Sequence, residues 1–264
     1  MQTKLQTKTM EVHHHPKVEK KNVREYFLEF IMIFLAVTLG FFAESYREYL
    51  NNLSKENEYM TALVEDLKSD TSFLQLSIHQ LIPYHLKWMD STRNLLQSTE
   101  HSGKDRMLYQ ALIIGTAWTY DFHFNQRTLS QLHSGGFALI RKKEAVNAIS
   151  NLEGNYKLFS PVIDEMQSMQ NDIDIASYAF LDGTTDYDAG KIAFEDPLFT
   201  KLQLSDVPET AVVKWQNKNA IMLYDDKLHK YSFYLRTGII DDYEIFIKEI
   251  TETMQAIQKA YKIK

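Results

Sequence analysis

The residues most capable of chemistry fall into three small groups, and the first is a single carboxylate inside an apolar run. Glu29 lies within YFLEFIMIFLAVTLGFFA, residues 26–43. A carboxylate at membrane depth costs free energy unless it is paired, protonated or reaches the interface. Two interpretations stay open: Glu29 is a functional intramembrane acid, or it lies at headgroup depth beside Lys21 or Arg24.

The second group is a set of titratable residues next to aromatic ones, in the segment DFHF. Asp121 and His123 could form an acid–base pair with His133. A general base also needs an orienting group and a nucleophile or substrate within reach. The sequence supplies only titratable residues in an aromatic setting, so we expect these side chains to belong to a capped loop and no residue to be catalytic.

The third group is an acidic loop that begins at Asp182 and invites comparison with a calcium loop. An EF-hand numbered from Asp182 would need Gly at its sixth position and Glu at its twelfth, where this chain has Tyr187 and Ala193. The chain has no cysteine, and no His-Glu-x-x-His, phosphate-binding or dinucleotide-binding motif is present. The sequence therefore predicts no metal site, no cofactor and a non-enzymatic protein.

Residues 26–43 are predicted to cross a membrane as one helix. At 1.5 Å per residue the stretch is roughly 27 Å long, close to the hydrocarbon thickness of a bilayer. The basic residues precede it, which predicts a cytoplasmic N-terminus. A cleaved signal peptide fits less well, because about 25 polar residues come first and no small-x-small site follows. We expect a bacterial inner-membrane protein with a basic, flexible cytoplasmic tail (1–25), this helix, and a helical periplasmic domain (44–264).

Charge and composition limit the class of the predicted domain. The net charge is −6, but residues 1–25 carry +3 and the remainder −9. Such an acidic body gives no electrostatic basis for binding nucleic acid. Nine glycines and five prolines in 264 residues are few, which favours long helices over many turns. The expected fold class is all-α: one N-terminal transmembrane helix that continues into a long helix and a helical bundle.

A stripe of small and apolar residues at helical spacing predicts a packing face on the membrane helix. Ala36 and Gly40 form a small-xxx-small pair, which lets two helices approach closely. The candidates for this helix interface are Glu29, Met32, Ala36, Leu39, Gly40 and Ala43.

The stripe continues beyond residue 43 with a spacing near 3.5 residues, which indicates lengthwise packing on another helix. Asn57 could set the register of a coiled coil. The alternative is packing inside the chain's own domain, because Leu63 and Phe73 widen the apolar face beyond a two-stranded seam. The candidates for this seam are Tyr46, Leu50, Leu53, Asn57, Met60, Val64 and Leu67.

The rest of the chain is predicted to form further helices around an aromatic-rich core. We expect a bend at Pro83, a cap at Asn125, a break at Ser134–Gly136 and a long loop over 182–210. The predicted helices after the bend span 105–119, 127–133, 142–152, 161–181, 210–231 and 241–261.

The layout resembles a large Bacteroidota family of single-pass inner-membrane proteins. The matching features are the basic N-terminus, the segment EYFLEFIMIFLAVTLGFFAE and a segment in the helical body with Thr128, Leu132, Ser134, Gly135, Leu139, Ile140 and Arg141. The resemblance implies residence in the inner membrane and a helical domain, and it brings no activity, cofactor or catalytic residue with it.

Three functions follow as hypotheses. The first is a membrane-anchored protein in the lipid bilayer that associates with itself or with another membrane protein. The second is an ion-coupled subunit that uses Glu29, similar in placement to the acid of single-pass stator partners, although Asp is usual there and no peptidoglycan-binding pattern appears. The third is a ligand sensor, which would need a separate output protein because the tail is short.

Overall fold

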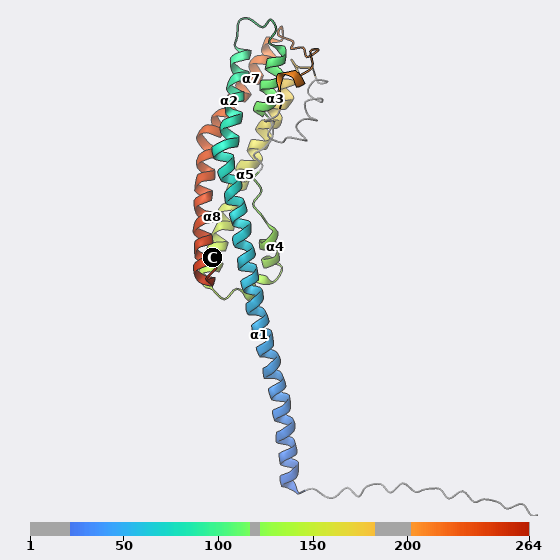
Figure 1. Cartoon of the computed structure of the whole chain (residues 1–264), viewed down its shortest axis with the longest axis vertical. Helices are drawn as coiled ribbons and strands as arrows, with labels where there is room; N and C mark the ends of the chain where they lie inside the picture. Colours follow the sequence, from blue (N-terminus) through green and yellow to red (C-terminus); the bar gives the residue numbers. More distant parts are fainter. Residues whose placement is uncertain (1–21, 117–121, 183–201, 264) are drawn as a thin grey trace, which may run out of the picture. The chain divides into compact units, whose positions relative to one another are not determined.

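The structure is a computed structural model that describes residues 22–116, 122–182 and 202–263 (Figure 1). Over these ranges the chain is helical and contains no strand, which confirms the all-α class. The chain divides into two compact units, residues 1–53 and 54–264. Helix α1 (Val23–Leu76) contributes residues to both units.

In the first unit, residues 23–53 form the N-terminal part of α1. The backbone N–H of Asn22 donates to a carboxylate oxygen of Glu25 at 3.2 Å. A side chain of the first turn therefore satisfies one of the backbone N–H groups that have no partner within the helix. The helical run from Val23 is long and apolar enough to cross a membrane, and none of its most apolar 18-residue window is buried. A largely apolar surface that no described residue covers is suited to lipid and unsuited to water.

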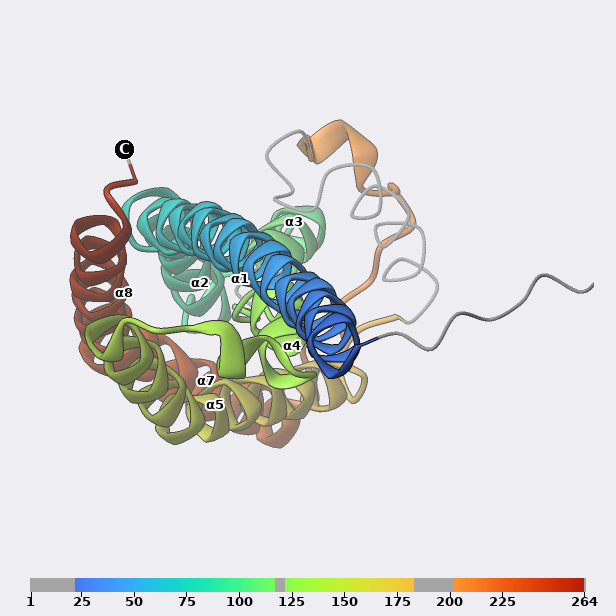
Figure 2. The ribbon, with the colours of Figure 1, turned by 90° about the horizontal axis from the view of Figure 1, so that it is seen from below.

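The second unit is a bundle of antiparallel helices. Seen from the end, α5, α7 and α8 form an arc beside α2 (Figure 2). Helix α3 packs on α2, α5 packs on both α7 and α8, and α2 meets α7, so that the core is closed. The elements after α1 are η1 (Ser77–Leu81), α2 (Ile82–Leu96), α3 (Asp105–Thr116), α4 (Arg127–His133), η2 (Gly136–Leu139), α5 (Lys143–Ser177), η3 (Leu204–Asp206), α7 (Lys218–Tyr234), η4 (Leu235–Ile239) and α8 (Ile240–Tyr261).

At Pro83, where a bend was predicted, the helical run is continuous, and a π-helical turn, η1, joins α1 to α2. Here the backbone N–H of Ile82 donates to the carbonyl oxygen of Ser77, five residues back. Proline has no N–H to donate and crowds the preceding turn, and one wider turn before it accommodates both effects. The helical run therefore passes Pro83 and ends at Leu96.

Several residues of the predicted seam are buried in the second unit's own core. Met60, Val64 and Leu67 are each at most 1% exposed. Leu63 is buried with them, so the apolar face of α1 is wider here than a two-stranded seam. This is the packing expected under the alternative that the long helix packs within its own domain.

The remaining seam residues are open to solvent or partly so. Tyr46, Leu50 and Asn57 are exposed, and Leu53 is half-buried. An exposed Asn57 faces no buried seam among the described residues, so the register role predicted for a buried asparagine does not apply in this single chain.

The prediction that Pro161 opens a new helix is wrong, because α5 runs without a break from Lys143 to Ser177 and contains the proline. The Pro161 ring lies on the exposed side of the helix. Phe159 and Ile163 on either side of it are buried. Burial of this continuous apolar stripe against α8 outweighs the lost backbone hydrogen bond, which costs about 3 kcal/mol.

The two final helices are also joined rather than separate. Helix α7 continues through the π turn η4 into α8, although a gap was predicted at 232–240. Leu235 and Ile239 of this turn are fully buried, so packing keeps it helical across Gly238.

Helix α7 begins at Lys218, eight residues after the predicted start at Thr210. The preceding residues are held in a non-helical path by Asp105 of α3. Its carboxylate accepts hydrogen bonds from the Val213 backbone N–H at 3.1 Å and the Trp215 indole N–H at 2.7 Å. A contact between residues so far apart in the chain outweighs the local preference for helix.

Candidate functional site

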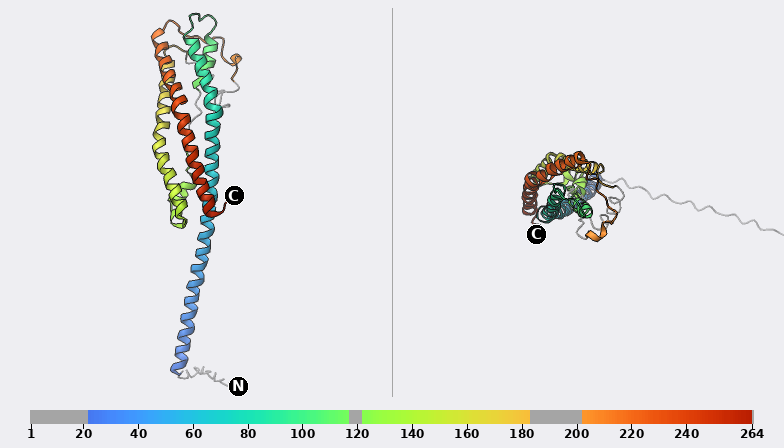
Figure 3. Two further views of the ribbon diagram at one scale, coloured as in Figure 1. Left: turned by 90° about the vertical axis from the view of Figure 1, so that its left-hand side faces the viewer. Right: turned by 90° about the horizontal axis from the view of Figure 1, so that it is seen from above.

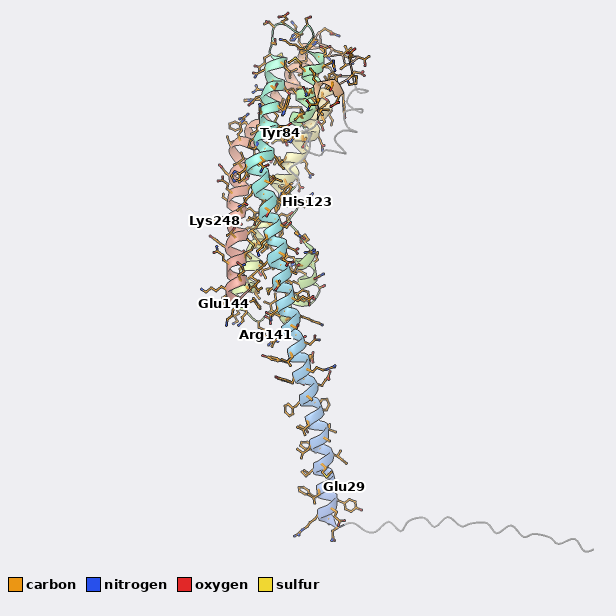
Figure 4. All side chains as sticks on the ribbon, in the orientation of Figure 1. Glu29, Tyr84, His123, Arg141, Glu144 and Lys248 are labelled. Carbon is orange, nitrogen blue, oxygen red and sulfur yellow. The ribbon has the colours of Figure 1, made fainter. Side chains whose placement is uncertain are left out.

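The predicted interface on the apolar part of α1 is open. Its six candidate residues, Glu29, Met32, Ala36, Leu39, Gly40 and Ala43, are all exposed, and Figure 4 shows Glu29 on this part of the helix. A Cβ atom built on Gly40 meets nothing within 4 Å. The described part of the chain therefore leaves the small-xxx-small surface free for another helix to approach.

In the second unit, three buried acids on α1 organise the structure, and the first is Glu56, which is 3% exposed. One of its carboxylate oxygens accepts hydrogen bonds from the Arg141 backbone N–H at 2.7 Å and from the Tyr261 hydroxyl at 2.6 Å. The Arg141 guanidinium lies 3.7 Å from the other oxygen. Glu56 thus ties α1 to the start of α5 and to the end of α8, and burial together with this hydrogen bond raises the pKa of Tyr261.

The second buried acid, Asp66, receives the start of α4. Its carboxylate accepts hydrogen bonds from the Thr128 backbone N–H at 3.2 Å, the Thr128 hydroxyl at 2.5 Å and the Asn125 side-chain amide at 3.2 Å, and it pairs with Arg127. Asp66 therefore caps a helix that lies about 60 residues away in sequence. The N-cap residue of α4 is Gln126, one residue after the predicted Asn125, and its own side chain makes no cap bond. The Asn125 side chain accepts from the Arg127 backbone N–H at 3.2 Å, so it still satisfies one donor of the first turn.

The third buried acid, Asp70, lies one turn further along α1 and accepts the Asn125 backbone N–H at 3.1 Å. Burial is the main cause that raises the pKa of Asp70 to about 6, and the nearby Asp66 adds to it, while the hydrogen bond from Asn125 opposes it. Asp70 thus exchanges its proton near pH 6, and it supports the same segment as Asp66.

The aromatic residues Phe122 and Phe124, which precede the segment held by these acids, pack into the core. Phe122 and Phe124 are buried and His123 between them is exposed, an alternation typical of extended chain. Phe122 lies 5.7 Å from Phe246 of α8, and Phe124 lies 5.0 Å from Tyr156 of α5, measured between ring centroids. The expected aromatic-rich core is confirmed. Phe122 and Phe124 thus both contact α5, through Tyr156, and α8, through Phe246.

A buried histidine, His85 of α2, also has a strongly perturbed pKa. Its ring Nδ1 contacts the carbonyl oxygen of Ile114 in α3. Burial lowers the pKa of His85 to about 4, and the contact with the carbonyl opposes this only in part. His85 is therefore neutral at physiological pH and stabilises the α2–α3 pair.

The chemistry of these groups is structural. The Asp66 and Glu56 carboxylates already accept several hydrogen bonds from the chain, and the described residues contain no group of three or more His, Asp or Glu that could hold a metal ion. His133 pairs with Glu153 at 2.6 Å. Asp121 and most of the predicted acidic loop, together with the tail 1–21, lie outside the described residues.

The buried acids were missed in reading the sequence, although a signal for them exists. Glu56 and Asp70 are fourteen residues apart, two heptads, and Leu63 lies midway between them on the same face. An acidic residue that shares a helix face with apolar core residues is expected to be buried and to accept hydrogen bonds from another segment. What the spacing could not tell is which distant segment would supply the donors.

Comparison with known proteins adds no relative: no family model, no curated protein and no solved structure matches this chain.

Proposed function

We propose that this chain is a non-enzymatic, single-pass membrane protein that acts through association of its membrane helix, either with a second copy or with another subunit of an envelope complex. The single observation that carries the proposal is the apolar surface of α1 near the N-terminus, of which none is buried by the residues that the structure describes. Such a surface needs lipid or another helix around it.

The open face around Gly40 supports association over simple anchoring. An anchor needs only apolar residues, whereas a face with Ala36 and Gly40 four residues apart lets two backbones approach closely. The second unit supports a non-enzymatic role, because its buried carboxylates are used as hydrogen-bond acceptors for its own backbone.

Cysteine cross-linking in native membranes tests the proposal, and the chain favours this method because it has no cysteine of its own. Cysteines at Met32 and Ala43 lie on the proposed face, and cysteines at Phe34 and Phe41 lie on the opposite face of the helix. We expect disulfide-linked dimers from the first pair of positions only.

The double substitution Ala36→Ile and Gly40→Ile should reduce the cross-linked fraction several-fold, because the added side chains keep the two helices apart. Phe41→Ile on the opposite face is the matched control and should leave cross-linking unchanged. Equal cross-linking on both faces, or no effect of the double substitution, would contradict association through this face.

Ion coupling through Glu29 is distinguished in the same membranes. Glu29→Gln keeps the size of the side chain and removes its charge. We expect Glu29→Gln to retain cross-linking, since association depends on packing at Ala36 and Gly40. A proton-dependent phenotype that Glu29→Gln abolishes at normal expression would instead support the ion-coupled function.

A further inference from the structure

A shallow groove lies between α5 and α8, which run side by side (Figure 3). It has a volume of about 250 Å³. The groove floor is formed by Phe159 and Phe246, which belong to the aromatic core. Its apolar walls carry Leu158 and Ile245, which are 78% and 58% exposed. These two large aliphatic side chains line the same groove on the outer surface and add nothing to the buried core, so they form an apolar patch that a partner could cover.

The walls have the spacing of two helix faces. On α5 the lining residues Asn155, Leu158 and Val162 follow steps of three and four, and on α8 Asp242, Ile245 and Glu249 do the same. Parallel ridges with this spacing fit the side chains of a third helix. The shape of the groove therefore matches a helix more closely than a compact ligand.

The charge of the groove is of one sign. Asp242 and Glu249 lie seven residues apart on α8, about 10 Å along the helix, on either side of Ile245. No Lys, Arg or His lines the groove, and neither acid has a hydrogen bond or ion pair with any described residue of the chain. Burial, with a contribution from Asp241, raises the pKa of Asp242, as expected for an acid without a cation nearby.

We propose that this groove docks a basic amphipathic helix of a partner protein. An apolar face on that helix would cover Leu158 and Ile245, and Lys or Arg residues about two turns apart would meet Asp242 and Glu249. A second copy of this chain is the weaker fit, because two such grooves facing each other would bring four uncompensated acids together. The groove lies wholly within residues 54–264, so the proposal does not depend on association of the membrane helix.

Binding of synthetic helices to the full chain tests the proposal. The chain is placed in phosphatidylcholine nanodiscs, whose lipid has no net charge, and titrated into a fluorescent amphipathic peptide with a leucine stripe flanked by lysines. A peptide with the same leucines and glutamates in place of the lysines is the matched probe. We expect fluorescence anisotropy to report saturable binding of the basic peptide alone, and no binding to empty nanodiscs.

Two pairs of variants locate the binding. Asp242→Asn with Glu249→Gln should weaken binding by about tenfold, since two charge pairs are lost. Leu158→Ser with Ile245→Ser should weaken it by about tenfold or more, since the apolar contact is lost. Leu158 and Ile245 are exposed, and Asp242 and Glu249 are half-buried. Circular dichroism checks that both variants keep the fold.

Glu58→Gln with Glu65→Gln is the matched control for charge, because these exposed acids of α1 are also seven residues apart and lie outside the groove. It should bind the basic peptide as the natural chain does. The proposal is overturned if this control loses affinity as strongly as the groove variants, if the acidic peptide binds as tightly as the basic one, or if the Leu158 and Ile245 variants keep full affinity.

Discussion

At the scale of single residues, the buried acids of α1 carry long-range organisation. Asp66 and Asp70 accept donors from residues 125–128, and Glu56 accepts donors from Arg141 and Tyr261. A buried carboxylate is costly unless donors satisfy it, so each acid specifies which distant segment must come to it. The raised pKa of Asp70 is accounted for by this buried, structural position.

The pH dependence of stability tests the role of Asp70. Its pKa is about 6 in the folded chain against an ordinary value of 3.8. Between these two pH values the folded chain holds a proton that the unfolded chain has lost, so this group makes the free energy of unfolding fall as pH rises from 4 to 6. The two pKa values set an upper limit of about 3 kcal/mol on the change.

Asp70→Asn should remove this part of the pH dependence, because the amide keeps an oxygen for the Asn125 N–H and does not titrate. Chemical denaturation at a series of pH values measures it. Asp226→Asn, at an exposed position of α7, is the control and should leave the slope as it is. Parallel curves for the natural chain and Asp70→Asn between pH 4 and 6 would show that Asp70 does not titrate there.

At the scale of elements, the close approach of α3 to α2 occurs at a glycine, Gly115. A Cβ on Gly115 of α3 would lie 3.0 Å from the Met89 backbone nitrogen and 3.2 Å from the Trp88 carbonyl carbon of α2. Backbone atoms cannot move aside as a flexible side chain does. The close approach of α3 to α2 therefore depends on glycine at this position.

Substitution of two helical glycines by alanine separates packing from helix propensity. Gly115→Ala should lower the free energy of unfolding by about 1–3 kcal/mol, because the α2–α3 pair must move apart. Gly154→Ala in α5, where an added Cβ meets nothing within 4 Å, should raise it by about 0.5–1 kcal/mol. Urea denaturation measures both, and a Gly115→Ala chain as stable as the natural one would contradict the close approach.

At the scale of the whole molecule, the chain combines two units with opposite surface requirements. Residues 54–264 bury a continuous apolar core, while the apolar window near the N-terminus buries none of its surface. The surface of residues 54–264 is therefore suited to water, and the apolar window near the N-terminus is suited to lipid.

Fractionation of cells that express the full chain checks this division. The natural chain should stay in the membrane pellet after alkaline carbonate extraction, because its apolar window is held in lipid. Leu35→Arg with Leu39→Arg should shift most of it to the soluble fraction, since each charge near the middle of the span costs about 3 kcal/mol. Leu35→Ile with Leu39→Ile is the control and should remain in the pellet; complete release of the natural chain by carbonate would contradict the membrane assignment.

The sequence alone determined the features that depend on neighbours along the chain. The helical class, the membrane-length apolar run, the turn at Asn125 that precedes α4 and the break at Gly135, which has a φ of +135°, follow from local composition and turn chemistry. The apolar stripe through Met60 and Leu67 was also visible as a periodic pattern, because helical spacing repeats every three to four residues.

Only the tertiary structure decided which segment packs against each helix face. It placed Met60 and Leu67 in the chain's own core, carried α5 through Pro161, and gave the buried acids of α1 their partners in segments 55 or more residues away. The physical reason is that periodicity identifies a face without identifying its neighbour, and that burial energy summed over a long helix exceeds the local cost of one proline.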